Sequence, residues 1–321
     1  MRHHSHKRRP LFALCAAIAF SPPFLADDAK PASRPGACAN RPDAGVMALP
    51  VRAIRGGSQT LDTLQPWNFV LTDGKAPIHI CGVAHDRQPA SLGIVLDIST
   101  SMRGRRSDLQ AIARLAIGKL LDASQPGDEY FLEYVSDVPV MPCAFGCGPR
   151  QILDGIHVQP KGKTALIDGL YMALHEMSKA RNPNRALLVL SDGLDTSSTR
   201  KFHEVENAYA DSPVPLFLLV PTEAGDPFLG PWPVVGAPAE ARRDLERLVA
   251  RSGGMAVGAI GSTATLAEMA EFASLIRSPY ILYFAAPPRH PTRLRAQIKG
   301  VRWKPHLLYG AAYETRMEGG L

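Results

Sequence analysis

The chain of 321 residues is 45% hydrophobic, 21% charged and only 7% aromatic. These values exclude a disordered chain, a coiled coil and a collagen-like rod, and the length allows one large domain or a medium domain with a small companion. The formal net charge is +6, but four of the 36 Lys and Arg residues lie within the first nine positions. The remainder is nearly neutral and has no basic run interleaved with aromatic residues, so nucleic-acid binding is not expected.

The N-terminal segment has the pattern of a secretory signal. Residues 1–26 combine a basic stretch up to Arg9, an apolar run from Leu11 to Phe20 and a polar exit. The apolar run is shorter than the roughly 20 residues that cross a bilayer, and no later segment qualifies. We expect an exported protein, periplasmic or secreted, without a membrane span after the signal; the cleavage site stays open. Residues 27–45 are predicted to form a linker.

Four cysteines follow the signal segment, namely Cys38, Cys81, Cys143 and Cys147. An even number in an exported protein indicates disulfides, which form in oxidising compartments. Three pairings are open, and only Cys38–Cys81 with Cys143–Cys147 keeps each bridge within one unit. The Cys143–Cys147 spacing is not C-x-x-C and has no adjacent His, so a structural bridge is favoured over a metal or redox site.

Residues 46–88 are predicted to form a small β unit. Short apolar runs occur at 47–51 and 67–71, and Asp73-Gly74 marks a hairpin turn before a further run at 78–80.

From Pro89 onward, predicted strands and helices alternate. Apolar runs predict strands at 92–96, 130–135, 186–190, 216–220 and 255–260, with an edge strand near 138–141 that leads into a turn at the two later cysteines. Helical spacing predicts helices at 109–121, 166–177, 239–251 and 265–276. Residues 89–278 are therefore predicted to have an α/β fold with a doubly wound, mostly parallel sheet, whose ligands bind beyond the carboxyl ends of the strands.

The C-terminal segment, residues 279–321, returns to β character. Runs at 280–285, 294–299 and 307–309 alternate between apolar and polar residues. We expect them to pair with the N-terminal β unit and to complete a small accessory β unit.

Oxygen-bearing side chains follow the predicted parallel strands, at the edge of the sheet where the carboxyl ends of these strands lie. Asp97, Ser99 and Ser101 form a D-x-S-x-S loop after the first parallel strand, Thr164 precedes a helix, and Asp192 follows another buried strand. Carboxylate and hydroxyl oxygens are hard ligands of the kind that Mg²⁺ prefers. Each residue alone could instead be a helix cap or a turn residue. The five together, on loops that a doubly wound sheet brings to one edge, predict a metal site.

This set resembles the metal-ion-dependent adhesion site of the von Willebrand factor type A (VWA) family. Residues 67–74, 166–170, 191–196 and 307–310 further resemble the bacterial secreted VWFA-related group, so that the resemblance extends over about residues 46–313. It implies that the hydroxyls of Ser99, Ser101 and Thr164 bind the cation directly or nearly so. It also implies that Asp97 and Asp192 bind directly or through water.

The same resemblance implies a function. The cation, Mg²⁺ with Mn²⁺ or Ca²⁺ as alternatives, would accept an Asp or Glu carboxylate from a partner protein, which makes the protein a binding module and not an enzyme. The sequence departs from the family at Ile98, Thr100, Lys161 and Lys163, which stand at or beside positions where Gly is frequent. These departures leave the five ligand residues intact but are expected to change the affinity of the site for the cation.

Two other functions stay open. The first is a scaffold whose site holds no metal. The second is a phosphatase similar to the haloacid dehalogenases with Asp97 as nucleophile; it is disfavoured because that chemistry needs a second carboxylate where Ser99 stands.

Two further groups of residues are hypothesised to contact the partner. A positive rim that attracts an acidic partner would consist of Arg103, Arg105, Arg106, Lys161 and Lys163. Aromatic anchors would be Phe228 and Trp232, in a long loop after a strand. A solvated charge cluster and a structural role in the helix layer are the respective alternatives. The partner's identity and the oligomeric state are not indicated.

Overall fold

The computed structural model describes residues 46–55, 60–85, 89–102, 109–156, 159–210, 212, 214–222, 239–260, 266–285, 294–302, 305–310 and 314–316. All of them belong to one unit, which spans 32–321. The predicted signal, the linker and Cys38 lie outside the described residues. Among the helices of the described part, none is both long and apolar enough to cross a membrane.

A six-stranded sheet forms the centre of the α/β part, in the order β10-β9-β8-β5-β6-β7. Its strands are β5 (Ala90–Asp97), β6 (Glu129–Val135), β7 (Val140–Cys147), β8 (Asn184–Leu190), β9 (Leu216–Thr222) and β10 (Ala256–Ile260). All neighbouring pairs are parallel except β6 and β7. The predicted doubly wound, mostly parallel sheet is confirmed.

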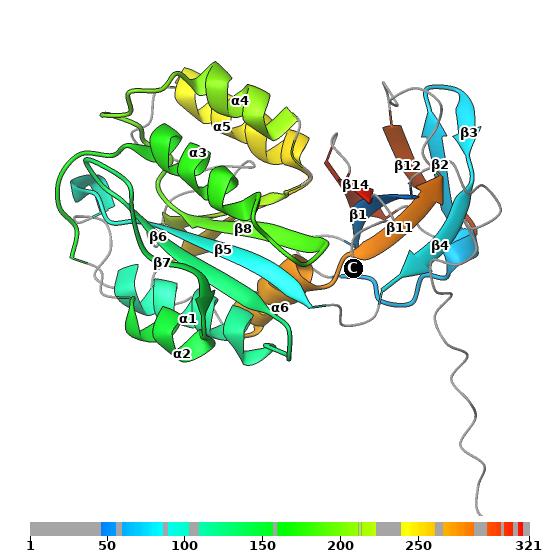
Figure 1. The fold of residues 1–321 in the computed structure, drawn as a ribbon, viewed down its shortest axis with the longest axis horizontal. Coiled ribbons are helices and arrows are strands. Elements are labelled where there is room, and N and C mark those ends of the chain that lie inside the picture. Colours follow the sequence, from blue (N-terminus) through cyan, green and yellow to red (C-terminus); the bar gives the residue numbers. More distant parts are fainter. Residues whose placement is uncertain are drawn as a thin grey trace, which may run out of the picture. The chain divides into compact units, whose positions relative to one another are not determined.

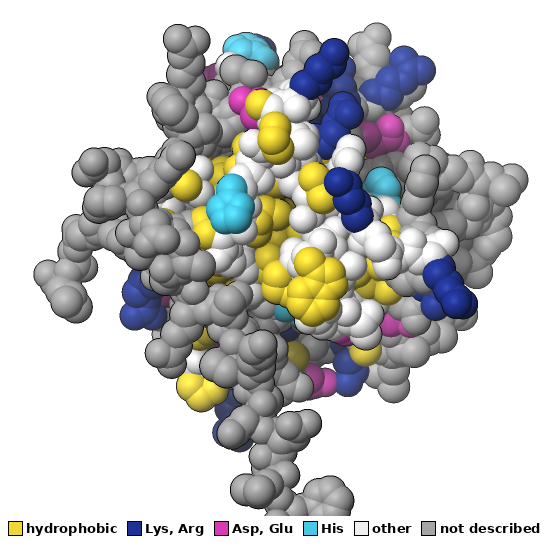
Figure 2. Space-filling view, turned by 90° about the vertical axis from the view of Figure 1, so that its right-hand side faces the viewer, with side chains coloured by type: hydrophobic (Ala, Val, Ile, Leu, Met, Phe, Trp, Pro, Cys, Tyr) yellow, Lys and Arg dark blue, Asp and Glu magenta, His cyan; other side chains and the backbone are white. Residues whose placement is uncertain are grey.

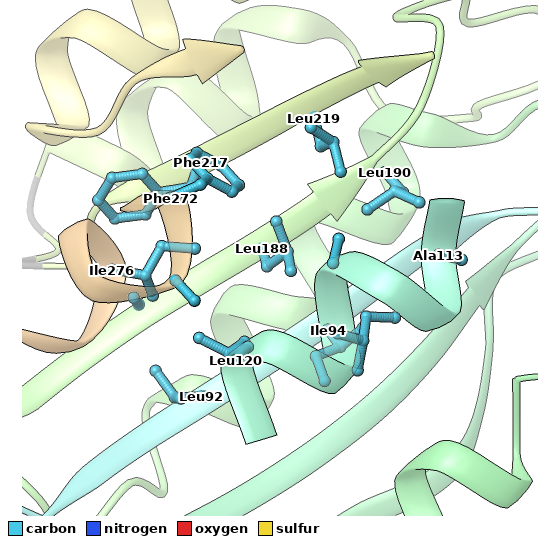
Figure 3. Close-up of a cluster of buried hydrophobic side chains, with 14 of the residues drawn as sticks. Leu92, Ile94, Ala113, Leu120, Leu188, Leu190, Phe217, Leu219, Phe272 and Ile276 are labelled. Carbon is cyan, nitrogen blue, oxygen red and sulfur yellow. The ribbon is translucent and has the colours of Figure 1, made fainter. Parts of the chain in front are cut away.

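Helices cover both faces of this sheet (Figure 1). They are α1 (Leu109–Asp122), α2 (Pro149–Asp154), α3 (Leu166–Met177), α4 (Phe202–Ala210), α5 (Ala239–Ser252) and α6 (Leu266–Arg277). Side chains alternate along each strand, so Ile94 of β5 packs on the α1 and α6 side, whereas Val95 packs on the α3 and α4 side. Figure 3 shows the first of these two cores, in which Leu120 and Phe272 meet the strands. Two apolar faces explain why the central strands read as unbroken hydrophobic runs.

Two smaller sheets form the accessory β part. One has the order β13-β1-β11-β4, with β14 also paired to β1, and the other has the order β12-β2-β3. Their strands are β1 (Val46–Ile54), β2 (Phe69–Asp73), β3 (Ala76–Ile78), β4 (Ile80–Ala84), β11 (Tyr280–Ala285), β12 (Leu294–Ile298), β13 (His306–Leu308) and β14 (Glu314–Arg316). Pairing of C-terminal strands with β1, β2 and β4 confirms the predicted joint β unit.

The predicted end of the edge strand was wrong. β7 does not stop before the cysteines but continues to Cys147, and the Cys143–Cys147 disulfide lies within it. The strand accommodates the bridge because its register against β6 shifts at irregularities on either side of Leu132. Cys81 is also disulfide-bonded, to a partner outside the described residues.

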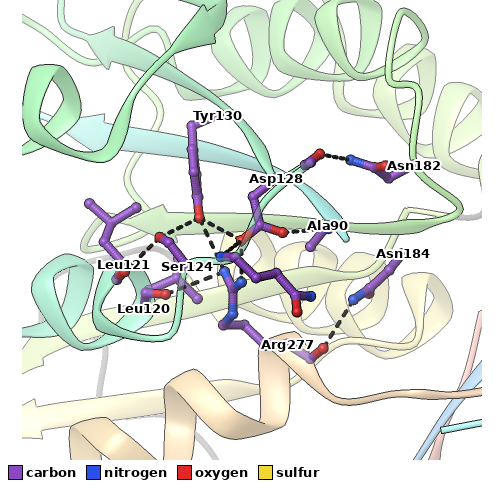
Figure 4. A network of polar contacts seen from close by, with 11 residues as sticks. Ala90, Leu120, Leu121, Ser124, Asp128, Tyr130, Asn182, Asn184 and Arg277 are labelled. Carbon is purple, nitrogen blue, oxygen red and sulfur yellow. Dashed lines mark hydrogen bonds and ion pairs between the residues drawn. The ribbon is translucent and has the colours of Figure 1, made fainter. Parts of the chain in front are cut away.

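The C-terminal end of α6 is held by buried polar contacts. Arg277 pairs with Asp128, and its guanidinium also donates to the carbonyl of Leu120 at 3.4 Å (Figure 4). Arg52 of β1 is buried and donates from Nε to the Leu275 carbonyl and from Nη2 to the Ile276 carbonyl, both at 2.8 Å. A residue of the accessory sheet thus satisfies helix-terminal carbonyls that have no partner within the helix.

Candidate metal centre

Asp97 is the last residue of β5 and has no exposed surface. β5 lies between β6 and β8, so its carboxyl end is enclosed by the loops that follow both neighbours. The carboxylate accepts two hydrogen bonds: Oδ1 from the backbone N–H of Ser99 at 2.9 Å, and Oδ2 from the Ser191 hydroxyl at 2.6 Å. These contacts fix the orientation of the carboxylate within the loop.

Burial raises the pKa of Asp97 to about 6, although the hydrogen bonds from Ser191 and Ser99 oppose this shift. The carboxylate of Asp192 raises the pKa further, which places two like charges within electrostatic reach of each other. A buried carboxylate with a second one nearby is an environment that a divalent cation would stabilise.

Two hydroxyls follow Asp97 on the same loop. Ser99 is fully buried, and its Oγ lies 3.0 Å from the Oγ of Ser101. The backbone N–H of Met102 donates to the Ser99 carbonyl at 3.1 Å, which turns the chain into a short 3₁₀ helix, Thr100–Met102. Within the D-x-S-x-S loop, the two serine hydroxyls therefore lie side by side.

Backbone hydrogen bonds connect the Thr164 loop to the other two loops. The N–H of Lys161 donates to the Ile98 carbonyl at 2.7 Å, and the N–H of Thr100 donates to the Gly162 carbonyl at 3.0 Å. Thr164 itself is buried, and its N–H donates to Thr196 Oγ1 at 3.0 Å. Since Thr196 follows Asp192 on one loop, the three segments form a single hydrogen-bonded assembly.

Asp192 lies on the loop after β8 and is half-buried. Its Oδ1 accepts the N–H of Leu194 at 3.1 Å. Gly193 has a φ of 80°, a conformation that favours glycine, and its N–H donates to Ser191 Oγ at 3.0 Å.

Ser191 was not among the predicted site residues, although its hydroxyl lies at the centre of this arrangement. The hydroxyl accepts the N–H of Gly193 and donates to Asp97, so it links Asp97 to the Asp192 loop. Its place directly before Asp192, at the end of a buried strand, is the signal that could have indicated this role.

Only part of the predicted partner-binding set can be located. The side chains of Lys161 and Lys163 are exposed, and the N–H of Lys163 donates to Asp137 Oδ1 at 2.8 Å, so an acidic group lies within the predicted positive rim. The other members lie outside the described residues, namely Arg103, Arg105, Arg106, Phe228 and Trp232.

The donor set consists of two carboxylates and three hydroxyls. In the described part of the chain, no group of three or more His, Cys, Asp or Glu side chains could hold a metal. An oxygen-only set suits Mg²⁺, Mn²⁺ or Ca²⁺ and not a thiolate- or imidazole-bound ion. The chemistry of the residues present therefore fits the expected hard cation.

Solved structures similar to this chain include a membrane protein and a pilus protein. An aerotolerance-related membrane protein from Bacteroides fragilis is 17% identical, with 58% of this chain and 98% of that chain covered and a TM-score of 0.43. The vWF domain of the type V pili tip protein Mfa5 from Porphyromonas gingivalis is 22% identical, with 34% and 40% covered and a TM-score of 0.30. The SpRpn10 VWA domain is 12% identical, with 57% and 93% covered and a TM-score of 0.40.

These similar structures include VWA-domain proteins. The similarity is distant and transfers no activity to this chain. No protein-family model matches the sequence, and no curated protein matches it significantly.

Proposed function

We propose that this chain is an exported, non-catalytic VWA-type protein that binds a divalent cation and, through it, a partner protein. The cation is Mg²⁺ in the first instance, and its ligands are Asp97, Ser99, Ser101, Thr164 and Asp192. A carboxylate from the partner completes the coordination.

The observation that carries this proposal is the environment of Asp97. Its carboxylate is fully buried, its pKa is raised by burial, and Asp192 adds like charge. Burial therefore makes the ionised form of Asp97 less favourable than it is in water. A bound cation supplies positive charge and an open position for an anionic ligand.

The residues around the site have separate tasks in this proposal. Ser191 and the Ser99 N–H orient the Asp97 carboxylate, while Thr196 holds the backbone of Thr164. The same contacts argue against Asp97 as a phosphatase nucleophile, since both of its oxygens accept hydrogen bonds and neither is exposed. Export is supported by the N-terminal pattern and by the Cys143–Cys147 bridge, which suits an oxidising compartment.

Isothermal titration of Mg²⁺ and Mn²⁺ into chelator-treated protein tests the metal site. Saturable one-to-one binding is expected, and its loss is expected in Asp97→Ala/Ser99→Ala. Asp122→Ala/Ser178→Ala is the matched control, because it removes an exposed Asp and an exposed Ser outside the site. Absence of binding at millimolar cation, or unchanged binding in the site variant, would contradict the proposal and favour the metal-free scaffold.

A further inference from the structure

The outer surface of the three-stranded sheet β12-β2-β3 is basic and carries an exposed tryptophan. Its inner side packs on the accessory core through Phe69, Leu71 and Ala296, so the alternate positions of the strands face solvent. We define the outer sheet surface by Trp67, Lys75, Arg295, Lys299 and Arg302, all of which are exposed. None of them belongs to the predicted metal site.

Positive charge is in excess on this surface. Residues 66–80 and 294–302 contain four Lys and Arg residues but only one acidic residue, Asp73. Within the described part of the chain, none of the four basic side chains forms an ion pair. Figure 2 shows Lys and Arg side chains dispersed around a hydrophobic area on the face turned toward the viewer.

The charges are spread out and do not converge on one point. Arg295 lies in β12, and Lys299 follows directly after the strand, four residues further on, which corresponds to about 13 Å at the usual rise of a strand. Such spacing suits a partner whose negative charge is distributed over an area, rather than a single small anion.

Trp67 adds an apolar anchor beside the positive charge. It is 76% exposed and stands in the 3₁₀ helix η2 (Pro66–Asn68). The next residue, Asn68, exchanges two hydrogen bonds with Lys299: Asn68 Nδ2 donates to the Lys299 carbonyl at 2.9 Å, and the Lys299 N–H donates to the Asn68 carbonyl at 2.8 Å. Trp67 and Lys299 are thereby held on neighbouring segments.

We propose that the outer sheet surface docks on an anionic phospholipid surface. An indole with one polar N–H suits the boundary between headgroups and acyl chains, and Lys and Arg side chains are attracted to acidic headgroups. The combination of the exposed Trp67 with dispersed basic residues fits this partner better than an acidic protein, whose negative charge would have to match the same spread positions.

Vesicle sedimentation with the full chain in the presence of chelator tests this inference. Phosphatidylcholine vesicles with and without phosphatidylglycerol are compared, at low and at high salt. Binding is expected only with phosphatidylglycerol and is expected to weaken as salt screens the charges. Lys299→Gln/Arg302→Gln should weaken it about thirtyfold, and Trp67→Ala should weaken it at both salt concentrations.

Arg150→Gln/Arg243→Gln, which removes two exposed Arg residues of α2 and α5, is the control and should bind like the parent chain. Because every variant keeps the same N-terminal segment, only differences between variants are read, and circular dichroism verifies that each is folded. Equal binding by the outer-surface variants and the parent overturns the inference. So does saturable binding to polyglutamate or duplex DNA without preference for the acidic vesicles, which would assign the surface to that polymer.

Discussion

Glu133 is a buried carboxyl group in the middle of β6, on the side that faces α3. Neither of its oxygens has a hydrogen-bond partner among the described residues, and burial raises its pKa to about 9. A Cβ at Gly169 of α3 would lie 2.9 Å from Glu133 Oε1, so the helix packs closely over the carboxyl group. The nearby Tyr209 hydroxyl, which Glu133 influences electrostatically, is also buried and has no hydrogen-bond partner in the described part of the chain.

The first prediction concerns the pH dependence that Glu133 causes. Between pH 4.5 and about 9 the Glu133 carboxyl group stays protonated in the folded chain but is ionised in the unfolded chain. The free energy of unfolding therefore falls as pH rises through that window. Glu133→Gln removes this titration. Urea unfolding at several pH values should show that the unfolding free energy of the variant increases relative to that of the parent chain as pH rises, by at most about 1.4 kcal/mol per pH unit.

Glu129 on the same strand supplies a control of opposite sign. Burial alone would raise its pKa, but hydrogen bonds from Ser91 and Arg181 lower it overall. The ionised Glu129 carboxylate stabilises the fold above the pKa that Glu129 has in the unfolded chain, and this stabilisation is lost as pH falls. Relative to the parent chain, Glu129→Gln should therefore become less stable as pH rises. A pH-independent difference between Glu133→Gln and the parent would refute the first prediction.

The second prediction tests Ser191, whose hydroxyl donates to the buried Asp97 carboxylate. Ser191→Ala leaves that oxygen without its side-chain donor and should cost about 1–3 kcal/mol of unfolding free energy in the metal-free protein. It should also weaken Mg²⁺ binding, because the carboxylate loses its fixed orientation. Urea unfolding and titration calorimetry measure the two effects, with the exposed Ser178→Ala as control. Unchanged stability would show that Ser191 does not support the site.

At the scale of elements, α3 begins without a side-chain cap of its own. Its N-cap residue is Ala165, and the caps come from the loop after β8. The N–H of Ile167 donates to Asp195 Oδ1 at 3.1 Å, and the N–H of Asp168 donates to Ser198 Oγ at 3.0 Å. The helix that follows Thr164 is thus bonded to the loop that carries Asp192.

The third prediction follows from this capping. Asp195→Ala should lower the unfolding free energy by about 1 kcal/mol, the usual effect of losing an N-cap. It should also lower Mg²⁺ affinity, although Asp195 is not a predicted ligand, because Thr164 and Asp192 lose one of their connections. Asp244→Ala on α5, which removes an ion pair with Arg247, serves as control and should leave the affinity unchanged. A stability loss without a change in affinity would reduce Asp195 to a structural role.

The elements that the sequence predicted are those with a strong apolar period. α1, α3, α5 and α6 were all predicted within one or two residues at each end. α2 was not predicted because it has only six residues, and α4 was not predicted because it buries only Val205 and Tyr209. Such helices form through tertiary contacts, and a periodicity argument does not detect them.

At the scale of the whole molecule, the convergence of the predicted ligands was foreseeable and the bonding between their loops was not. Parallel strands place Asp97 and Asp192 at one sheet edge whatever the loop details are. The contacts of Ser191 and Thr196 depend on loop conformation, which local sequence does not determine. In the same way, the alternation of apolar and polar residues in the terminal segments predicted that these segments pair as β-strands. Nothing in the sequence indicated that Arg52 would reach α6.

The last prediction concerns this contact between the accessory sheet and the α/β part. Arg52 donates to two terminal carbonyls of α6, its guanidinium lies 4.9 Å from the Phe217 ring centroid, and burial lowers its pKa to about 9. The chain passes from α6 directly into β11. The Arg52 hydrogen bonds to α6 therefore lie next to the covalent connection between the α/β part and the accessory sheet. Arg52→Met should cost about 2–4 kcal/mol, because both carbonyls stay buried without their donors.

The parent chain should unfold in one transition, with coincident curves from far-ultraviolet circular dichroism and tryptophan fluorescence. In Arg52→Met we expect the two curves to separate, because the accessory sheets lose their side-chain attachment to α6. Arg150→Met, at an exposed position of α2, is the control and should leave both curves coincident. Coincident curves in Arg52→Met with a shift below 1 kcal/mol would mean that Arg52 adds little beyond the covalent connection through β11.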